Sequence, residues 1–259
     1  MTARKLLPIT FLFFLFIIAC KDDKEQSFSK MSFVFSHEVN GVPLVFDTLK
    51  YVNDAGNHYM VNDIQYFISN MTLYKDGGKS YKIKDADYTH YVDTYLPNTF
   101  SWIVPDQIEI GTYDSLNFIL GLDQQLNKTG YFVNPPQVDM FWPDVMGGGF
   151  HYLKMNGKWL QPSGQEYPFN FHMGIGMEIV GNDTTFIPNF VKVSLPASVF
   201  SVKEGVTTKI AIKMNIESWF RTPHLWNWDS IGGAIMMNQS AMNWAKENGA
   251  DVFSMSVLP

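Results

Sequence analysis

The chain has little of the two residue types that mark redox and phosphate chemistry. Its 259 residues include a single cysteine, Cys20, which excludes an intrachain disulfide and a site built from several thiolates. It has only two arginines, Arg4 and Arg221. Nucleic-acid binding needs clustered Lys and Arg, and phosphate sites commonly use the guanidinium fork. The composition, with a formal net charge of −6, therefore argues against both kinds of partner.

Charge is also absent from residues 6–19, an apolar run that follows Arg4 and Lys5 and ends at Cys20. The run is too short to cross a bilayer, and its pattern is that of a secretory signal. Residues 17–20 read Ile-Ile-Ala-Cys, which resembles the lipobox of bacterial lipoproteins. We therefore expect residues 1–19 to be a lipoprotein signal peptide and Cys20 to be acylated. Acylation would consume the only thiol and attach the protein to a membrane.

A short charged segment follows the cysteine. Residues 21–25 read Lys-Asp-Asp-Lys-Glu, and such a stretch stays solvated, so residues 20–30 are expected to act as a tether. The segment resembles an export tag that carries some lipoproteins to the cell surface, although a plain linker facing the periplasm would look the same. Either way we expect a lipid-anchored protein of the outer membrane. Cleavage would remove Arg4 and Lys5, two of the 19 basic residues, and leave 17 against 25 acidic ones, a formal charge of −8.

Short strand patterns separated by turn residues recur through the rest of the chain. They favour an all-β fold, a single-domain antiparallel β-sandwich with long loops over residues 31–259. One short C-terminal helix is predicted from about Gln239 to Asn248, with Gly249 as its stop. A hairpin turn is predicted at residues 76–78. The predicted strands cover residues 31–35, 59–61, 64–68, 71–74, 80–83, 89–92, 115–120, 149–155, 167–173, 184–187, 190–195 and 209–216.

The segment from residue 141 to residue 172 is the part most suited to carry chemistry. His151 follows three consecutive glycines at the start of a predicted strand, and His172 lies on the next predicted strand. No Gly-Lys-Ser/Thr follows the glycines, so they are not a phosphate loop. If the two strands pair or face each other, His151 and His172 converge.

Several fragments of the chain, in this order, resemble the MbnP-like copper-binding proteins, a family related to the MopE and CorA proteins of methane-oxidising bacteria. The most specific fragments are Met-Phe-Trp at 140–142, Gly-Phe-His-Tyr-Leu-Lys at 149–154 and Phe-His-Met-Gly at 171–174. Weaker matches lie at 33–37, 39–44, 66–73, 92–93, 116–123 and 251–253.

The resemblance implies a β-rich extracytoplasmic protein that holds copper through histidines. In some members a partner dihaem enzyme oxidises a tryptophan to kynurenine. Carried over to this chain, the family's histidines match His37 and His172, and its tryptophan matches Trp142. Family members often have a second tryptophan two residues later, where this chain has Asp144, so the kynurenine ligand is in doubt.

Two further histidines complete the predicted metal site. His151 is an added imidazole that would join His37 and His172 in binding the metal, and His224 is a fourth candidate. Imidazole suits copper and zinc, and thioether suits Cu(I), so a chain with six histidines and fourteen methionines has the ligands for such a site. The sequence does not distinguish copper from zinc. Copper affinity is expected to fall as pH drops through about 6.5, because imidazole must lose its proton to coordinate.

The resemblance favours copper sequestration or delivery over two other functions. No G-x-S-x-G, H-E-x-x-H or paired-carboxylate signature occurs, so we expect a protein that is not an enzyme. The alternative is a surface-exposed glycan- or peptide-binding module without metal, in which Trp102, Trp226 and Trp228 would form the platform. The oligomeric state is left open.

Overall fold

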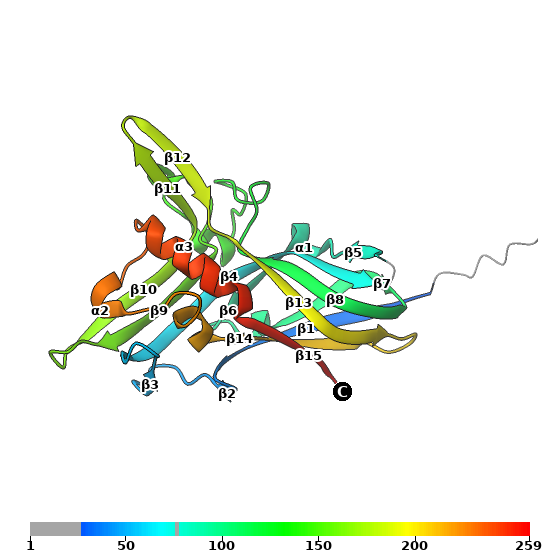
Figure 1. The fold of residues 1–259 in the computed structure, drawn as a ribbon. Coiled ribbons are helices and arrows are strands. Elements are labelled where there is room, and N and C mark those ends of the chain that lie inside the picture. The colour runs from blue at the N-terminus through cyan, green and yellow to red at the C-terminus, as the bar shows by residue number, and fades with distance from the viewer. Residues whose placement is uncertain (1–26, 76–77) are drawn as a thin grey trace, which may run out of the picture.

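The computed structural model describes residues 27–75 and 78–259 (Figure 1). The expected signal peptide, the acylated Cys20, the charged residues 21–25 and the first two residues of the turn at 76–78 lie outside the described residues. Within the described part of the chain, no helix has both the length and the apolar character needed to cross a membrane.

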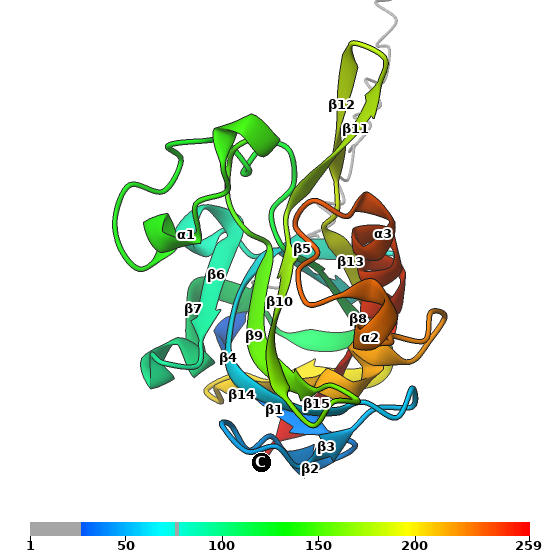
Figure 2. The ribbon, with the colours of Figure 1, turned by 90° about the vertical axis from the view of Figure 1, so that its left-hand side faces the viewer.

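Two large sheets pack against each other around one hydrophobic core (Figures 1 and 2). Rings from the two sheets meet between them, as Tyr66 and Phe118 of one sheet do with Phe253 of the other. The predicted all-β sandwich is confirmed. The first sheet has the order β15-β14-β1-β2, with β7 also on β1, and consists of β15 (Phe253–Leu258), β14 (Thr208–Asn215), β1 (Phe28–Val39), β2 (Val42–Pro43) and β7 (Ser101–Glu109).

The second sheet is organised by β4 (His58–Lys75), an 18-residue strand to which five other strands pair directly. Both faces of its middle are covered, so residues 66–69, Tyr-Phe-Ile-Ser, are all buried. A strand buried on both faces is expected to be apolar without alternation. The sheet has the order β10-β9-β4-β8-β13 and consists of β10 (Glu166–Met173), β9 (Leu153–Leu160), β4, β8 (Gly111–Leu120) and β13 (Val191–Val202), with β3 (Tyr51–Val52), β5 (Ser80–Lys82) and β6 (Thr89–Asp93) also on β4.

Two details differ from the sequence expectation. The sandwich is not purely antiparallel, because β1 runs parallel to β14 while β15 and β7 run antiparallel to their partners. The first strand also begins earlier than predicted, so residues 28–30 belong to β1 rather than to the tether. Phe28 pairs with Glu109, and the Ser29 hydroxyl donates to the carbonyl of Val206 at 2.9 Å. These contacts explain why the first residues of β1 are ordered despite their polar surroundings in sequence.

The C-terminal helix is confirmed as α3 (Gln239–Asn248). The Asn238 side chain accepts a hydrogen bond from the Ala241 backbone N–H, the usual way in which an N-cap satisfies a free amide of the first turn. Ala241, Met242 and Ala245 form its buried face. The other α-helices of the described chain are single turns, α1 (Asp85–Tyr88) and α2 (Trp228–Ile231).

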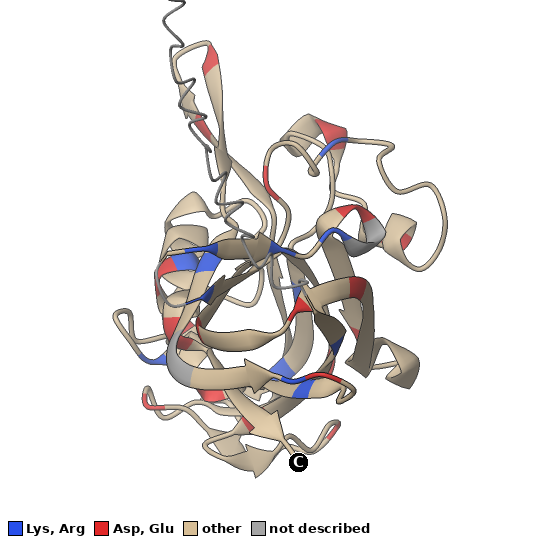
Figure 3. Cartoon of the chain, turned by 90° about the vertical axis from the view of Figure 1, so that its right-hand side faces the viewer, with Lys and Arg blue, Asp and Glu red and all other residues tan. Residues whose placement is uncertain are grey.

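Two excursions leave the sandwich at the same end. One is the hairpin of β11 (Ile175–Val180) and β12 (Asp183–Pro188), and the other is the connection from β8 to β9, which carries the 3-10 turns η2 (Gln137–Met140) and η3 (Asp144–Met146) (Figures 1 and 2). Figure 3 shows that the positions of Lys and Arg alternate with those of Asp and Glu along the described part of the ribbon in this view.

Candidate metal site

The structure brings His151 and His172 together at the base of the β8–β9 connection. Strands β9 and β10 pair antiparallel, so that Leu153 lies opposite Met173 and Lys154 lies opposite His172. His151 comes two residues before β9, and its ring centroid lies 5.2 Å from that of His172, at an interplanar angle of 85°. The convergence that the sequence left conditional on strand pairing is present.

One hydrogen bond to each ring determines which of its nitrogens carries a proton. His151 Nδ1 lies 3.0 Å from the Met140 carbonyl oxygen, which can only accept, so Nδ1 is the protonated nitrogen. His172 Nε2 lies 2.8 Å from Asn156 Oδ1. The amide of Asn156 donates through Nδ2 to Asp63 Oδ1 at 2.8 Å, which orients its oxygen toward His172. The nitrogens with free lone pairs are therefore His151 Nε2 and His172 Nδ1.

The free nitrogen of His172 is an unsatisfied group in the folded protein. Its Nδ1 is buried and has no hydrogen-bond partner among the described residues. A buried acceptor without a partner costs on the order of 1–3 kcal/mol. Metal-binding histidines typically donate their other ring N–H to a carbonyl or carboxylate, which holds the ring in place. Both His151 and His172 have this arrangement, so the residues present fit a bound metal ion.

Burial keeps both imidazoles neutral. Loss of solvation lowers the pKa of His151 to about 4, although its hydrogen bond to Met140 opposes the shift. Burial, with smaller contributions from the neighbouring His151 and Lys154, lowers the pKa of His172 to about 3. Protons therefore compete with a metal only at a lower pH than the value of about 6.5 expected from an unperturbed histidine. Both rings are ready to coordinate at neutral pH.

Trp142 forms one wall of the site. Its side chain is fully buried, and its ring centroid lies 4.7 Å from that of His151 at an angle of 72°. The indole N–H donates to the Met146 carbonyl at 3.2 Å. Gly174, which follows β10, lies directly against the indole, because a Cβ there would come within 2.5 Å of the ring. The unmodified tryptophan thus supplies packing next to the two histidines rather than a ligand atom.

Asp144, where the family often has a second tryptophan, has a structural task. Its Oδ1 accepts a hydrogen bond from the Thr129 hydroxyl at 2.8 Å, and that hydroxyl also accepts from the Gly149 backbone N–H at 3.0 Å. Gly149 has a φ of 83°, a conformation that favours glycine. The carboxylate therefore stabilises the glycine loop that leads to His151.

The other two predicted ligands lie in different surroundings. His37 is an inward-facing residue of β1, and its ring meets those of Tyr66 and Phe100 at 5.7 and 5.9 Å. The His224 ring stacks on Trp244, and its Nε2 lies 2.5 Å from Glu247 Oε2.

The predicted set of three or four converging histidines is therefore not assembled. No cluster of three or more His, Cys, Asp or Glu side chains suited to a metal occurs within residues 27–75 and 78–259. The physical reason for His37 is strand alternation, which directs its side chain between the sheets. His224 is held in a turn by its backbone N–H bond to Asn248.

The proposed aromatic platform is not exposed. Trp102, Trp226 and Trp228 are 4%, 0% and 1% exposed, so all three belong to the core. Trp226 and Trp228 pack against Phe171 and Phe169 of β10. These three tryptophans cannot form the face of a glycan-binding module.

Three contributors to the site have no signal in the sequence. They are the Met140 carbonyl and the side chains of Asn156 and Asp63, which together orient both rings. Asn156 lies on β9 and Asp63 on β4, and these two residues are paired in the β4–β9 ladder. Only knowledge of the strand register would have placed this pair next to His172.

Comparison with known proteins supports the resemblance noted in the sequence. The profile of the MbnP family matches residues 28–243, most of the chain. The fold is similar to that of MbnP from Methylosinus trichosporium, with a TM-score of 0.58, 12% sequence identity, and coverage of 90% of this chain and 100% of that one. At that identity the structural likeness shows the fold alone. No curated protein sequence gives a significant match. The family match over the greater part of the chain shows that this protein belongs to the MbnP family.

Proposed function

We propose that this protein is a lipid-anchored copper-binding protein of the cell envelope that binds copper non-catalytically through His151 and His172, for sequestration or delivery. The observation that carries the proposal is the pair of fixed tautomers. One ring donates its N–H to Met140 and the other to Asn156, and each retains a free lone pair on its second nitrogen. A pair of neutral imidazoles held in this way is a ligand set that only a metal or a proton donor would satisfy.

Copper in its reduced state suits the pair better than zinc does. Zinc sites in proteins usually have three or four protein ligands, whereas Cu(I) accepts two. The pair also lies near Lys154, whose positive charge lowers the pKa of both histidines. The same charge repels a bound cation, and the repulsion is twice as large for a divalent ion as for Cu(I). Both considerations favour Cu(I) at this site.

Trp142 is the residue on which a dihaem oxidase partner would act. It packs against His151, and oxidation of its indole to kynurenine would place new polar atoms beside that ligand. The unmodified ring keeps water away from one side of the histidine pair. Mass spectrometry of the protein from its native host would show whether the tryptophan has gained one oxygen and lost one carbon, the net change on conversion to kynurenine.

Copper binding is tested by competition with a chromophoric Cu(I) chelator in the wild type, in His151→Ala, in His172→Ala and in the double variant. We expect one copper per wild-type chain, at least a 100-fold loss of affinity in each single variant, and no measurable binding in the double variant. His224→Ala is the matched control, since it removes an imidazole elsewhere in the molecule and is expected to leave affinity unchanged. Stoichiometric copper in the double variant would contradict the proposed site.

Membrane anchoring is tested separately. We expect the mature protein to fractionate with outer membranes and to carry a diacylglyceryl group on Cys20, detected by mass spectrometry of the N-terminal peptide. Cys20→Ala should release the protein into the soluble fraction without changing its copper affinity. Membrane association of the Cys20→Ala variant would contradict the lipid anchor.

A further inference from the structure

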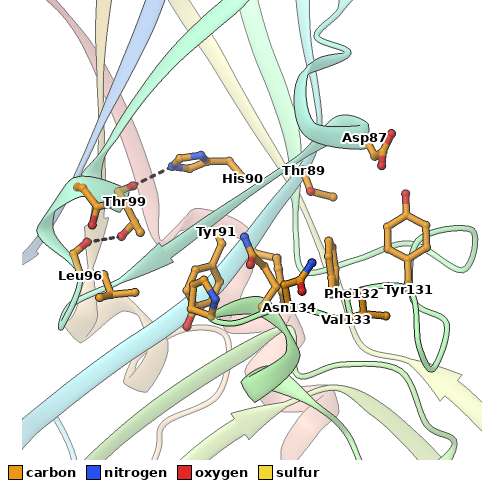
Figure 4. Close-up of a pocket in the computed structure, with 14 residues that line it drawn as sticks. Asp87, Thr89, His90, Tyr91, Leu96, Thr99, Tyr131, Phe132, Val133 and Asn134 are labelled. Atoms are coloured by element: carbon orange, nitrogen blue, oxygen red, sulfur yellow. Dashed lines mark hydrogen bonds between the residues drawn. The ribbon is translucent and has the colours of Figure 1, made fainter.

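A cavity of about 570 Å³ opens between β6, the 3-10 turn η1 (Pro97–Phe100) and residues 131–137 (Figure 4). Its volume lies within the range of about 300–1,000 Å³ that small-molecule sites occupy. It is distinct from the histidine pair, because none of the residues that line it belongs to the candidate metal site. The two regions are connected by η2, which has Gln137 in the wall of the cavity and Met140 against His151.

One wall of the cavity is a group of aromatic rings in contact with one another. Phe67 and Phe132 are stacked, with centroids 5.1 Å apart and an interplanar angle of 7°. Tyr91 lies 5.3 Å from Phe67, and Tyr131 meets Phe132 edge-on at 5.0 Å. Phe67 and Tyr91 are buried, while Tyr131 is 37% exposed at the opening. The wall therefore presents flat apolar surface that solvent can reach, which suits a planar ring.

Side-chain amides provide polar contacts around this wall. Asn98, Asn134 and Gln137 line the cavity, and their amide groups make no hydrogen bond with any described residue. Figure 4 shows Asn134 between Tyr91 and Phe132. Amides with free donors and acceptors next to an apolar wall can orient a ligand that carries one polar group.

The charge that lines the cavity is negative. Among the described residues that line it, Asp87 is the only charged one, and none is Lys or Arg. Further carboxylates act on the two tyrosines of the wall. Burial is the main cause that raises the pKa of Tyr91, and the charges of Asp93 and Asp139 add to it. Burial likewise raises the pKa of Tyr131, with the charges of Asp87 and Asp123 adding to it. A negative potential beside exposed aromatic faces attracts a cation and repels an anion.

We propose that this cavity binds a small aromatic amine, with its ring against the Phe132 and Tyr131 wall and its ammonium group attracted by Asp87. The aromatic wall accounts for the ring, the free amides for a polar group, and the surrounding carboxylates for the positive charge. The site requires no metal, so the amine proposal can be tested separately from copper binding.

The test uses three probes with the same ring and different charge: tryptamine, indole and indole-3-acetate. Their binding to the metal-free protein is measured by isothermal titration calorimetry. We expect tryptamine to bind most tightly and indole-3-acetate most weakly. Indole-3-acetate binding as tightly as tryptamine, or no binding of any probe at millimolar concentration, would overturn the proposal.

Variants place the binding in this cavity. Val133 lines the cavity and is 70% exposed, so Val133→Lys adds a positive charge without disturbing the core. It should weaken tryptamine binding about two- to fivefold, the size expected for an exposed charge pair, and tighten that of indole-3-acetate. Val199→Lys is the matched control, because Val199 is 67% exposed on β13, and it should change neither. An equal effect of both substitutions would mean a general charge effect and would overturn the assignment.

Two more variants separate the ring from the charge. Asp87→Asn should weaken tryptamine binding about two- to fivefold and leave indole unchanged, and asparagine tolerates the positive φ of 54° at this position. Phe132→Ala should weaken all three probes, with thermal unfolding as a check that the variant folds. The double variant His151→Ala/His172→Ala should bind tryptamine as the wild type does. Loss of tryptamine binding in that variant would place the amine at the histidine pair instead.

Discussion

His37 is buried and His172 is half-buried, desolvation lowers the pKa of both, and each has a buried ring nitrogen without a hydrogen-bond partner among the described residues. Their surroundings differ. His37 lies among aromatic rings between the two sheets, next to Tyr66, whose hydroxyl is also unpaired. His172 has a second imidazole 5.2 Å away and an amide that holds its other nitrogen.

This difference shows that burial alone does not make a metal site. An unsatisfied imidazole in an aromatic core has no second ligand, so a metal there would gain one bond and lose its hydration. The histidine pair offers two lone pairs, with hydrogen bonds that hold both rings before a metal arrives. Preorganised ligands of this kind lose little conformational freedom on binding.

The largest expected effect is the difference in Cu(I) affinity between alanine variants of the two histidines. His172→Ala should lower Cu(I) affinity at least 100-fold, because it removes one of two ligands, whereas His37→Ala should change it less than twofold. Chelator competition at pH 7 measures both. Similar losses in the two variants would contradict the separation of His37 from the site.

The next effect concerns stability against acid. The pKa of His37 is about 4 in the folded protein, below the value of 6.5 for a solvated histidine, so the unfolded state binds the extra proton between these pH values. The free energy of unfolding is therefore not reduced by His37 above pH 6.5. It falls by about 3 kcal/mol as the pH is lowered from 6.5 to 4.

We expect His37→Phe to remove this part of the pH dependence of the unfolding free energy. The rings of Tyr66 and Phe100 that face His37 do not change charge in this range. Urea unfolding of the metal-free protein at pH 7.0, 5.5 and 4.5 measures the slope of the unfolding free energy against pH. Comparison of this slope between wild type and variant removes any stability difference that is the same at every pH. Equal slopes in the two proteins would show that His37 is not the group responsible.

An intermediate effect tests the support of the histidine pair. Asn156→Ala removes the acceptor for His172 Nε2–H and should lower Cu(I) affinity about 10- to 100-fold while both ligands remain. Asn170→Ala is a control, since Asn170 lies opposite Asn156 in the β9–β10 ladder and makes no side-chain bond to His172. An unchanged affinity in Asn156→Ala would mean that the ring needs no such support.

The smallest effect comes from Lys154. Its charge disfavours a cation at both histidines, so Lys154→Gln should raise Cu(I) affinity about two- to fivefold. The increase should diminish at high salt, as screening of a partly exposed charge requires. A decrease in affinity would indicate that Lys154 has a direct part in holding the site.

The fold class was predictable because the residue patterns that indicate strands and helices lie within short segments of the chain. Alternating apolar residues indicated many of the strands, and the apolar spacing with its Gly249 stop placed α3 at the residues observed. The parallel pairing of β1 with β14 was not predictable, since these strands are about 180 residues apart and their patterns fit either direction.

By itself the sequence determined the ligand chemistry: one cysteine, six histidines, and two of these on neighbouring strands. It could not decide which histidines meet. Strand alternation places His37 between the sheets, while the register of β4, β9 and β10 brings Asp63, Asn156 and His172 into one chain of hydrogen bonds. Register depends on contacts between residues far apart in the chain, so only the tertiary structure selected His151 and His172 from the six.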